Sequence, residues 1–60
     1  MTELLRKYDL LKRGVQVAVK NGINRNYMLT RLINEVQELA IECNHTEIFD
    51  YTVLLSESFV

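Results

Sequence analysis

Apolar residues recur at spacings of three and four on both sides of Asn21–Gly22, and this periodicity constrains the fold more than any other sequence feature. After Thr2, the first set predicts an amphipathic helix over about residues 2–21 and consists of Leu4, Tyr8, Leu11, Val15 and Ala18, with Leu5 and Val19 beside it. Gly22 can adopt the left-handed conformation that ends a helix. The second set predicts a helix over about residues 25–43, capped by Asn24 or Asn26, and consists of Met28, Leu29, Leu32, Ile33, Val36, Leu39, Ala40 and Cys43. Two such helices with a short break between them predict an antiparallel helical hairpin.

The segment "TEIFDYTVLLSESFV", from Thr46 onward, fits two kinds of secondary structure. A helix capped by Thr46 places on one face Ile48, Tyr51, Thr52, Leu55 and Phe59. A strand places on one face Phe49, Tyr51, Val53 and Leu55, and its β-branched and aromatic residues suit a sheet. The chain has no second strand-like segment to pair with it, so we favour a short third helix over about residues 47–57. The prediction is therefore a single all-α domain spanning residues 1–60.

The chain has only 60 residues, and a domain of that size buries only roughly 60% of the surface that its unfolded chain exposes. Cys43 is the one cysteine, so an internal disulfide is impossible and a zinc site would lack ligands. Oligomerisation is the usual alternative, and we expect dimerisation to complete the hairpin into a bundle. The segment "MTELLRKYDLL" carries charges among its leucines, unlike a signal peptide or a membrane span, and this favours a cytoplasmic location.

Charge is distributed unevenly, although the net charge is only −1. Residues 1–31 hold seven basic and two acidic side chains, a net +5, whereas residues 32–60 hold six acidic and no basic side chains, a net −6. If the bend lies at residues 22–24, residue i of the first helix lies near residue 45 − i of the second. This register sets Arg6 and Lys7 against Glu38 and Glu42, and Lys12 and Arg13 close to Glu35. The charges would then specify the register of the hairpin, since exposed ion pairs add only ~0 to 1 kcal/mol each to stability.

A helix-turn-helix transcriptional regulator, with residues 15–34 as its DNA-reading unit, is the alternative interpretation. Ala18, Gly22 and Ile23 match the turn of that motif, and "LTRLIN" from Leu29 resembles the start of the recognition helix in lac-type repressors, "VSRVVN". The match needs one extra residue in the turn and requires Gly14 to divide the first helix in two. The resemblance implies contacts to phosphates and bases from Lys20, Arg25, Asn26 and Arg31.

The hairpin interpretation explains the same residues without an insertion. "INRNYM", from Ile23, also resembles the bend of the sporulation-checkpoint histidine-kinase inhibitors, which are small helical hairpins with Leu-Asn-Arg-Asp-Phe-Ile at that place. This resemblance covers six residues, and we infer no membership of the family from it. We expect a small regulatory or inhibitory protein that binds another protein, a copy of itself, or both.

Apolar residues outside the predicted core are the candidates for partner binding. Leu10 and Val17 lie seven residues apart on the first helix, and Gly14 lies between them. A glycine in mid-helix costs roughly 1 kcal/mol relative to alanine, so close approach by another backbone would explain it. The full set of candidate partner-binding residues is Leu10, Gly14, Val17, Tyr27, Leu54 and Phe59.

The sequence gives little basis for catalysis. Its only serines are Ser56 and Ser58 and its only histidine is His45, so it offers no convincing pair of nucleophile and base. Cys43, His45 and Glu47 alternate across a helix break, but Cys43 falls on the apolar face of the second helix, which favours a buried and inert thiol over a metal ligand. We expect neither an enzyme nor a bound cofactor or metal.

Overall fold

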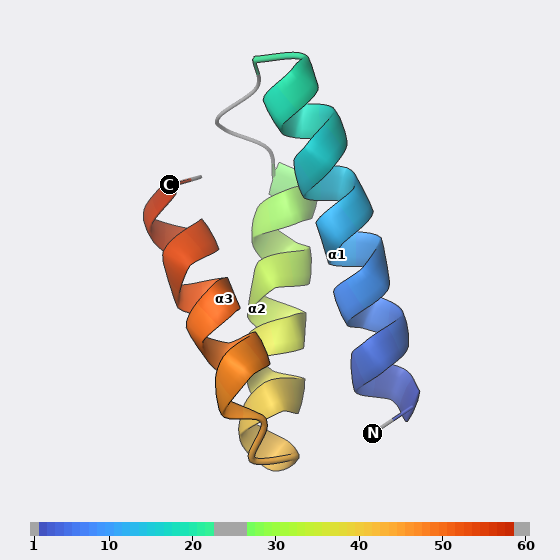
Figure 1. Ribbon diagram of the computed structural model, residues 1–60, viewed down its shortest axis with the longest axis vertical. Coiled ribbons are helices and arrows are strands. Elements are labelled where there is room, and N and C mark those ends of the chain that lie inside the picture. Colours follow the sequence, from blue (N-terminus) through green and yellow to red (C-terminus); the bar gives the residue numbers. More distant parts are fainter. Residues whose placement is uncertain (1, 23–26, 59–60) are drawn as a thin grey trace.

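The computed structural model describes residues 2–22 and 27–58 and contains three helices: α1 (Thr2–Lys20), α2 (Tyr27–Glu42) and α3 (Thr46–Ser58). Consecutive helices run in opposite directions, with α2 in the middle (Figure 1). The two described ranges contain no strand. The predicted all-α hairpin with a third helix is thus confirmed, and the segment from Thr46 is a helix rather than a strand.

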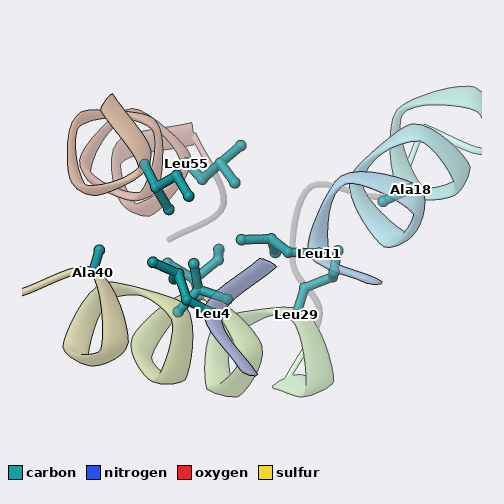
Figure 2. Packing of buried hydrophobic residues seen from close by; sticks show 9 residues of the cluster. Leu4, Leu11, Ala18, Leu29, Ala40 and Leu55 are labelled. Atoms are coloured by element: carbon teal, nitrogen blue, oxygen red, sulfur yellow. The ribbon is translucent and has the colours of Figure 1, made fainter. Parts of the chain in front are cut away.

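The hydrophobic core lies where the three helices meet. Figure 2 shows the side chains of Leu4 and Leu11 from α1 and Leu55 from α3 converging over α2. The fully or nearly fully buried apolar residues are Leu4, Leu11, Ala18, Leu29, Ile33, Val36, Ala40, Ile48 and Leu55. Thr52 is buried among them, and its hydroxyl donates a 2.6 Å hydrogen bond to the Phe49 carbonyl one turn earlier. The core therefore holds no unsatisfied side-chain polar atom in the described part of the chain.

Aromatic side chains join the two outer helices. The rings of Tyr8 on α1 and Tyr51 on α3 meet edge to face, with centroids 5.5 Å apart and an interplanar angle of 87°. The Lys12 ammonium lies 4.8 Å from the centroid of the Tyr8 ring, a cation–π contact. The remaining packing of α1 and α3 is mainly against α2.

Gly22 ends α1 as the sequence predicts. Its φ of 68° is left-handed, and its amide donates to the Val19 carbonyl at 3.2 Å. Asn21 adds two hydrogen bonds to the Val17 carbonyl, from its amide at 3.1 Å and from its side chain at 2.9 Å. The predicted caps Asn24 and Asn26 lie outside the described residues.

The corner between α2 and α3 is built from Asn44 and His45. Asn44 has a left-handed φ of 55° and donates its amide to the Ile41 carbonyl at 3.1 Å, while the His45 amide donates to the Ala40 carbonyl at 2.9 Å. These two bonds form a Schellman motif that closes α2. His45 then begins α3, because its Nδ1 accepts the Ile48 amide at 3.3 Å and its carbonyl accepts the Phe49 amide. The predicted cap, Thr46, is instead the first residue of α3.

The predicted charge register of the hairpin is wrong by about one helical turn. Lys7 pairs with Glu35 at 2.6 Å rather than with Glu38 or Glu42. Arg6 and Arg13 pair within α1 instead, with Glu3 at 2.6 Å and Asp9 at 3.0 Å. The difference arises because α1 extends past the first residue of α2 (Figure 1), so the bend is not symmetric.

Candidate functional site

An open groove lies between α1 and α2, and none of the residues that line it belongs to α3. Its volume is about 600 Å³. The lining residues come from α1 and α2 and are Lys7, Arg13, Gly14, Val17, Ala18, Met28, Leu29, Arg31, Leu32 and Glu35. We call this feature the hairpin groove. It is lined by apolar residues and glycine together with four charged residues, and protein-binding surfaces commonly combine apolar and charged side chains.

Gly14 forms part of the floor of the hairpin groove. A Cβ atom at this position would lie 2.8 Å from Cδ2 of Leu29, which is closer than nonbonded carbon atoms tolerate. The glycine therefore lets α1 approach the buried Leu29 of α2. The sequence led us to expect a close neighbour at Gly14 from a partner or a second copy, and the structure places such a neighbour within the same chain.

Two exposed apolar side chains stand on either side of that floor. Val17 on α1 has 59% of its surface exposed, and Met28 on α2 has 70%. Leu10 is 50% exposed and lies two turns before Val17 on α1. Single exposed apolar side chains are ordinary, but Val17 and Met28 line a concave surface, where a partner can bury them together, whereas Leu10 does not line it.

An ion pair across the hairpin closes one end of the groove. The Lys7 ammonium donates a hydrogen bond to Glu35 Oε2 at 2.6 Å. This hydrogen bond and the charge of Lys7 hold the pKa of the Glu35 carboxyl below its ordinary value of 4.5, and the charge of Arg31 adds a smaller effect in the same direction. The pair therefore links α1 to α2 at neutral pH, where Glu35 is ionised.

The face that contains the groove changes sign of charge along its length. Arg13 and Arg31 line the groove itself, and Lys20 lies beyond them at the end of α1. Past the Lys7–Glu35 pair, a neighbouring hollow of about 290 Å³ is lined by Glu3, Lys7, Glu35, Glu38, Leu39 and Glu42. Among residues 2–22 and 27–58, no ion pair involves Lys20, Arg31, Glu38 or Glu42. One end of this face is thus basic and the other acidic.

The structure brings together some of the predicted partner-binding residues and separates others. Gly14 and Val17 line the groove, and Tyr27, 75% exposed, is the residue before Met28. Leu54 is exposed on α3 and does not contribute to the groove. Phe59 lies outside the described residues.

The residues predicted for nucleic-acid binding are only partly described. Lys20 and Arg31 are exposed, while Arg25 and Asn26 lie outside the described residues. Gly14 does not divide the first helix, because α1 runs unbroken from Thr2 to Lys20. The division of this helix that the helix-turn-helix interpretation requires is therefore not found.

Met28 is the groove residue that sequence reasoning missed, since it was assigned to the core. It lies at the edge of the wide apolar face of α2, where α1 does not cover it. The same error applies to Leu5 and Val19, which were placed beside the apolar stripe of the first helix and are 50% and 66% exposed. The width of the apolar stripe is the signal for such residues. A stripe that is wider than the surface covered by the adjacent helix leaves an exposed margin.

His45 and Ser58 form hydrogen bonds at the ends of α3. His45 Nδ1 caps α3, and the Ser58 hydroxyl donates to the Leu54 carbonyl at 3.1 Å. The Cys43 thiol is half-buried and packs against the core. Within the described ranges, no cluster of three or more histidine, cysteine, aspartate or glutamate side chains is arranged to hold a metal ion. None of the described helices combines the length and apolar character needed to cross a membrane.

Comparisons with protein-family models, with curated proteins and with solved structures give no match for this chain. The hairpin groove, a concave surface lined by exposed apolar side chains, is the candidate binding site.

Proposed function

We propose that this chain is a small cytoplasmic regulatory or inhibitory protein that acts by binding another protein through the hairpin groove. One observation carries the proposal: exposed apolar side chains of two helices, Val17 and Met28, flank a concave apolar floor. Burying such a side chain contributes ~1.5 to 3 kcal/mol. Interface energy usually concentrates in a few well-packed anchors of this kind.

The charged residues of the groove contribute to selectivity more than to affinity. Exposed charges at the edge of an interface mainly change the association rate and its salt dependence. Arg13 and Arg31 line the groove and Glu38 lies just beyond it, so a target segment with charges in the opposite order is favoured. Such a segment is most simply an amphipathic helix, which lays its apolar side chains into a groove between helices.

Site-specific photocrosslinking tests the proposal in the organism from which the chain comes. A crosslinking amino acid at Met28 should capture a discrete protein, and the additional change Val17→Ser should reduce that capture. Ile41 provides the matched control, because it is 58% exposed on the same helix but does not line the groove. Equal capture from both positions, or capture of nucleic acid from Met28, would contradict the proposal.

A further inference from the structure

We infer that a second copy of this chain covers the hairpin groove in the free protein, related by a twofold axis that swaps the two ends of the face. This inference rests on the proposed function in one respect, since it takes the same groove as the docking surface. It goes further by naming the occupant and its orientation. Dissociation of the dimer then becomes the step that exposes the groove to a target.

The charge pattern of the face is the first argument for this occupant. The basic end carries Lys20 and Arg31, and the acidic end carries Glu38 and Glu42, all without ion pairs in the described ranges. The molecule is 32 Å long and 19 Å wide, with the helices along its long axis, so Lys20 at the end of α1 and Glu42 at the end of α2 are well separated (Figure 1), whereas Arg31 and Glu38 lie two turns apart on α2 and line one hollow. A twofold axis across the helices lays the basic end of one copy over the acidic end of the other, twice by symmetry.

The alternative orientation is disfavoured by the same charges. A twofold axis along the helices would lay Arg31 near Arg31 of the partner and Glu38 near Glu38 of the partner. Like charges brought together at an interface oppose association and suppress the wrong arrangement. The face is therefore complementary to itself in only one of the two ways in which its helices can stack lengthwise.

The apolar composition of the face is the second argument. Leu10, Val17 and Met28 are at least half exposed; Val17 and Met28 line the groove beside Arg31, in the basic half of the face. A twofold interface buries each of them twice, which suits a 60-residue chain with a small core of its own. The Lys7–Glu35 pair is satisfied within each copy and needs no partner across the interface.

Sedimentation equilibrium of the purified chain tests the apolar part of the inference. The wild type should sediment at twice its 7.0 kDa mass at micromolar concentration. The variant Val17→Ser/Met28→Ser should raise the dimer dissociation constant at least about tenfold, a change of about 1.4 kcal/mol. Ile41→Ser should leave the constant unchanged. A monomer at all concentrations, or a dimer weakened by Ile41→Ser but not by the groove variant, would overturn the inference.

Charge exchange tests the orientation. Lys20→Glu/Arg31→Glu makes both ends acidic, and Glu38→Lys/Glu42→Lys makes both ends basic, so each variant should dimerise less tightly at low salt, where charges are least screened. Combining all four changes in one chain exchanges the ends and should restore the dimer. Circular dichroism confirms that each variant is folded. Failure of the combined variant to dimerise better than either parent, with its fold intact, would exclude the end-swapped arrangement.

These measurements use the purified chain alone, so their outcome is separate from that of the crosslinking experiment. A monomeric chain whose Met28 crosslinks a target would refute the dimer and leave the proposed function standing. A chain that dimerises and whose variants behave as expected, but whose Met28 crosslinks no target, would support the dimer and refute the proposed function.

Discussion

At residue 14, the absence of a side chain lets α1 approach α2. Helix propensity alone favours replacement of this glycine, since alanine stabilises a helix interior by roughly 1 kcal/mol relative to glycine. The opposing effect is local, because a Cβ atom would lie 2.8 Å from Leu29 Cδ2 and no other side chain of the described residues lies within 4 Å of it. The balance between the two effects depends on whether the buried Leu29 side chain can move.

A double-mutant cycle at residues 14 and 29 measures that balance. We expect Gly14→Ala to change the free energy of unfolding little in the wild type but to raise it by about 1 kcal/mol in a Leu29→Ala background, because the close contact is then absent. Urea unfolding of the four proteins at one protein concentration gives the coupling energy. Leu32→Ala is the control background, since Leu32 lines the groove but does not crowd residue 14. Equal effects of Gly14→Ala in all three backgrounds would show that the contact has no energetic weight.

The sequence predicts the buried residues of α1 well and the margins of its stripe poorly. Leu4, Leu11 and Ala18 recur every seven residues and are all buried, as predicted. Periodicity identifies which side of a helix faces its neighbours, but the neighbours decide how far round the helix their cover reaches. Met28 is exposed for that reason, and its role in the groove was not predictable without the position of α1.

At the scale of the helical elements, two adjacent residues end one helix and begin the next. Asn44 holds the left-handed conformation that closes α2, and His45 supplies the first side-chain cap of α3. Asparagine tolerates this conformation better than most residues with a side chain, and glycine adopts it freely. The direction that α3 takes along α2 therefore depends on the backbone of one residue.

Substitutions at Asn44 should distinguish the effect of backbone conformation on the free energy of unfolding from the effect of helix propensity. Asn44→Ala should lower the free energy of unfolding by about 1 kcal/mol, because a Cβ-bearing residue without a short polar side chain is strained at this φ. Asn44→Gly should leave it nearly unchanged. Asn34→Ala is the matched control, since Asn34 is exposed within α2 and alanine there should stabilise slightly. Thermal unfolding of the three variants gives the comparison, and destabilisation by glycine as large as by alanine would refute the conformational explanation.

Most of the described ends of the three helices were predictable to within one or two residues. The period of the apolar residues predicts α1 and α2, and the lack of a pairing partner for a strand predicts α3. The cap of α3 was missed because histidine is an uncommon cap and Thr46, a common one, follows directly. Which of two adjacent polar residues caps a helix depends on where the preceding helix ends, and here the conformation of Asn44 sets that point.

At the scale of the whole molecule, the Lys7–Glu35 pair links the acid stability of the fold to the hairpin. The pKa of Glu35 is lowered from 4.5 in the folded protein, mainly by the hydrogen bond from Lys7 and then by its charge. A lowered folded-state pKa means that the stabilising effect is present above pH 4.5 and is lost as the pH falls through the folded value.

Removal of the Glu35 charge should therefore lower the stability of the fold at neutral pH and leave it unchanged in acid. We expect Glu35→Gln to lower the melting temperature at pH 7 and to have progressively less effect below pH 4.5, as the wild-type carboxyl is protonated. Melting curves of both proteins from pH 7 to pH 3 give the comparison. Glu3→Gln controls for the carboxyl that Arg6 holds within α1, whose pKa is also lowered. A Glu35→Gln effect of constant size across this range would show that the pair does not contribute through its charge.

The register of the hairpin was beyond prediction from charge alone. Basic residues on α1 and acidic residues on α2 can pair in several registers one turn apart, and Arg6 and Arg13 also have acidic partners three and four residues away on their own helix. The close approach at Gly14 restricts the register further, because it places Leu29 of α2 at the level of that glycine. The sequence marked Gly14 as unusual but did not reveal which residue it accommodates.

The up-down-up order of the helices places the start of α1 and the end of α3 toward opposite ends of the long axis (Figure 1). In the end-swapped dimer, the end of α3 in one copy therefore lies toward the same end of the assembly as the start of α1 in the other. A flexible linker of roughly 20 residues spans about 25 Å on average, which is comparable to the width of the molecule. Two copies joined in tandem by such a linker form a single polypeptide whose halves associate at a fixed local concentration, independent of dilution.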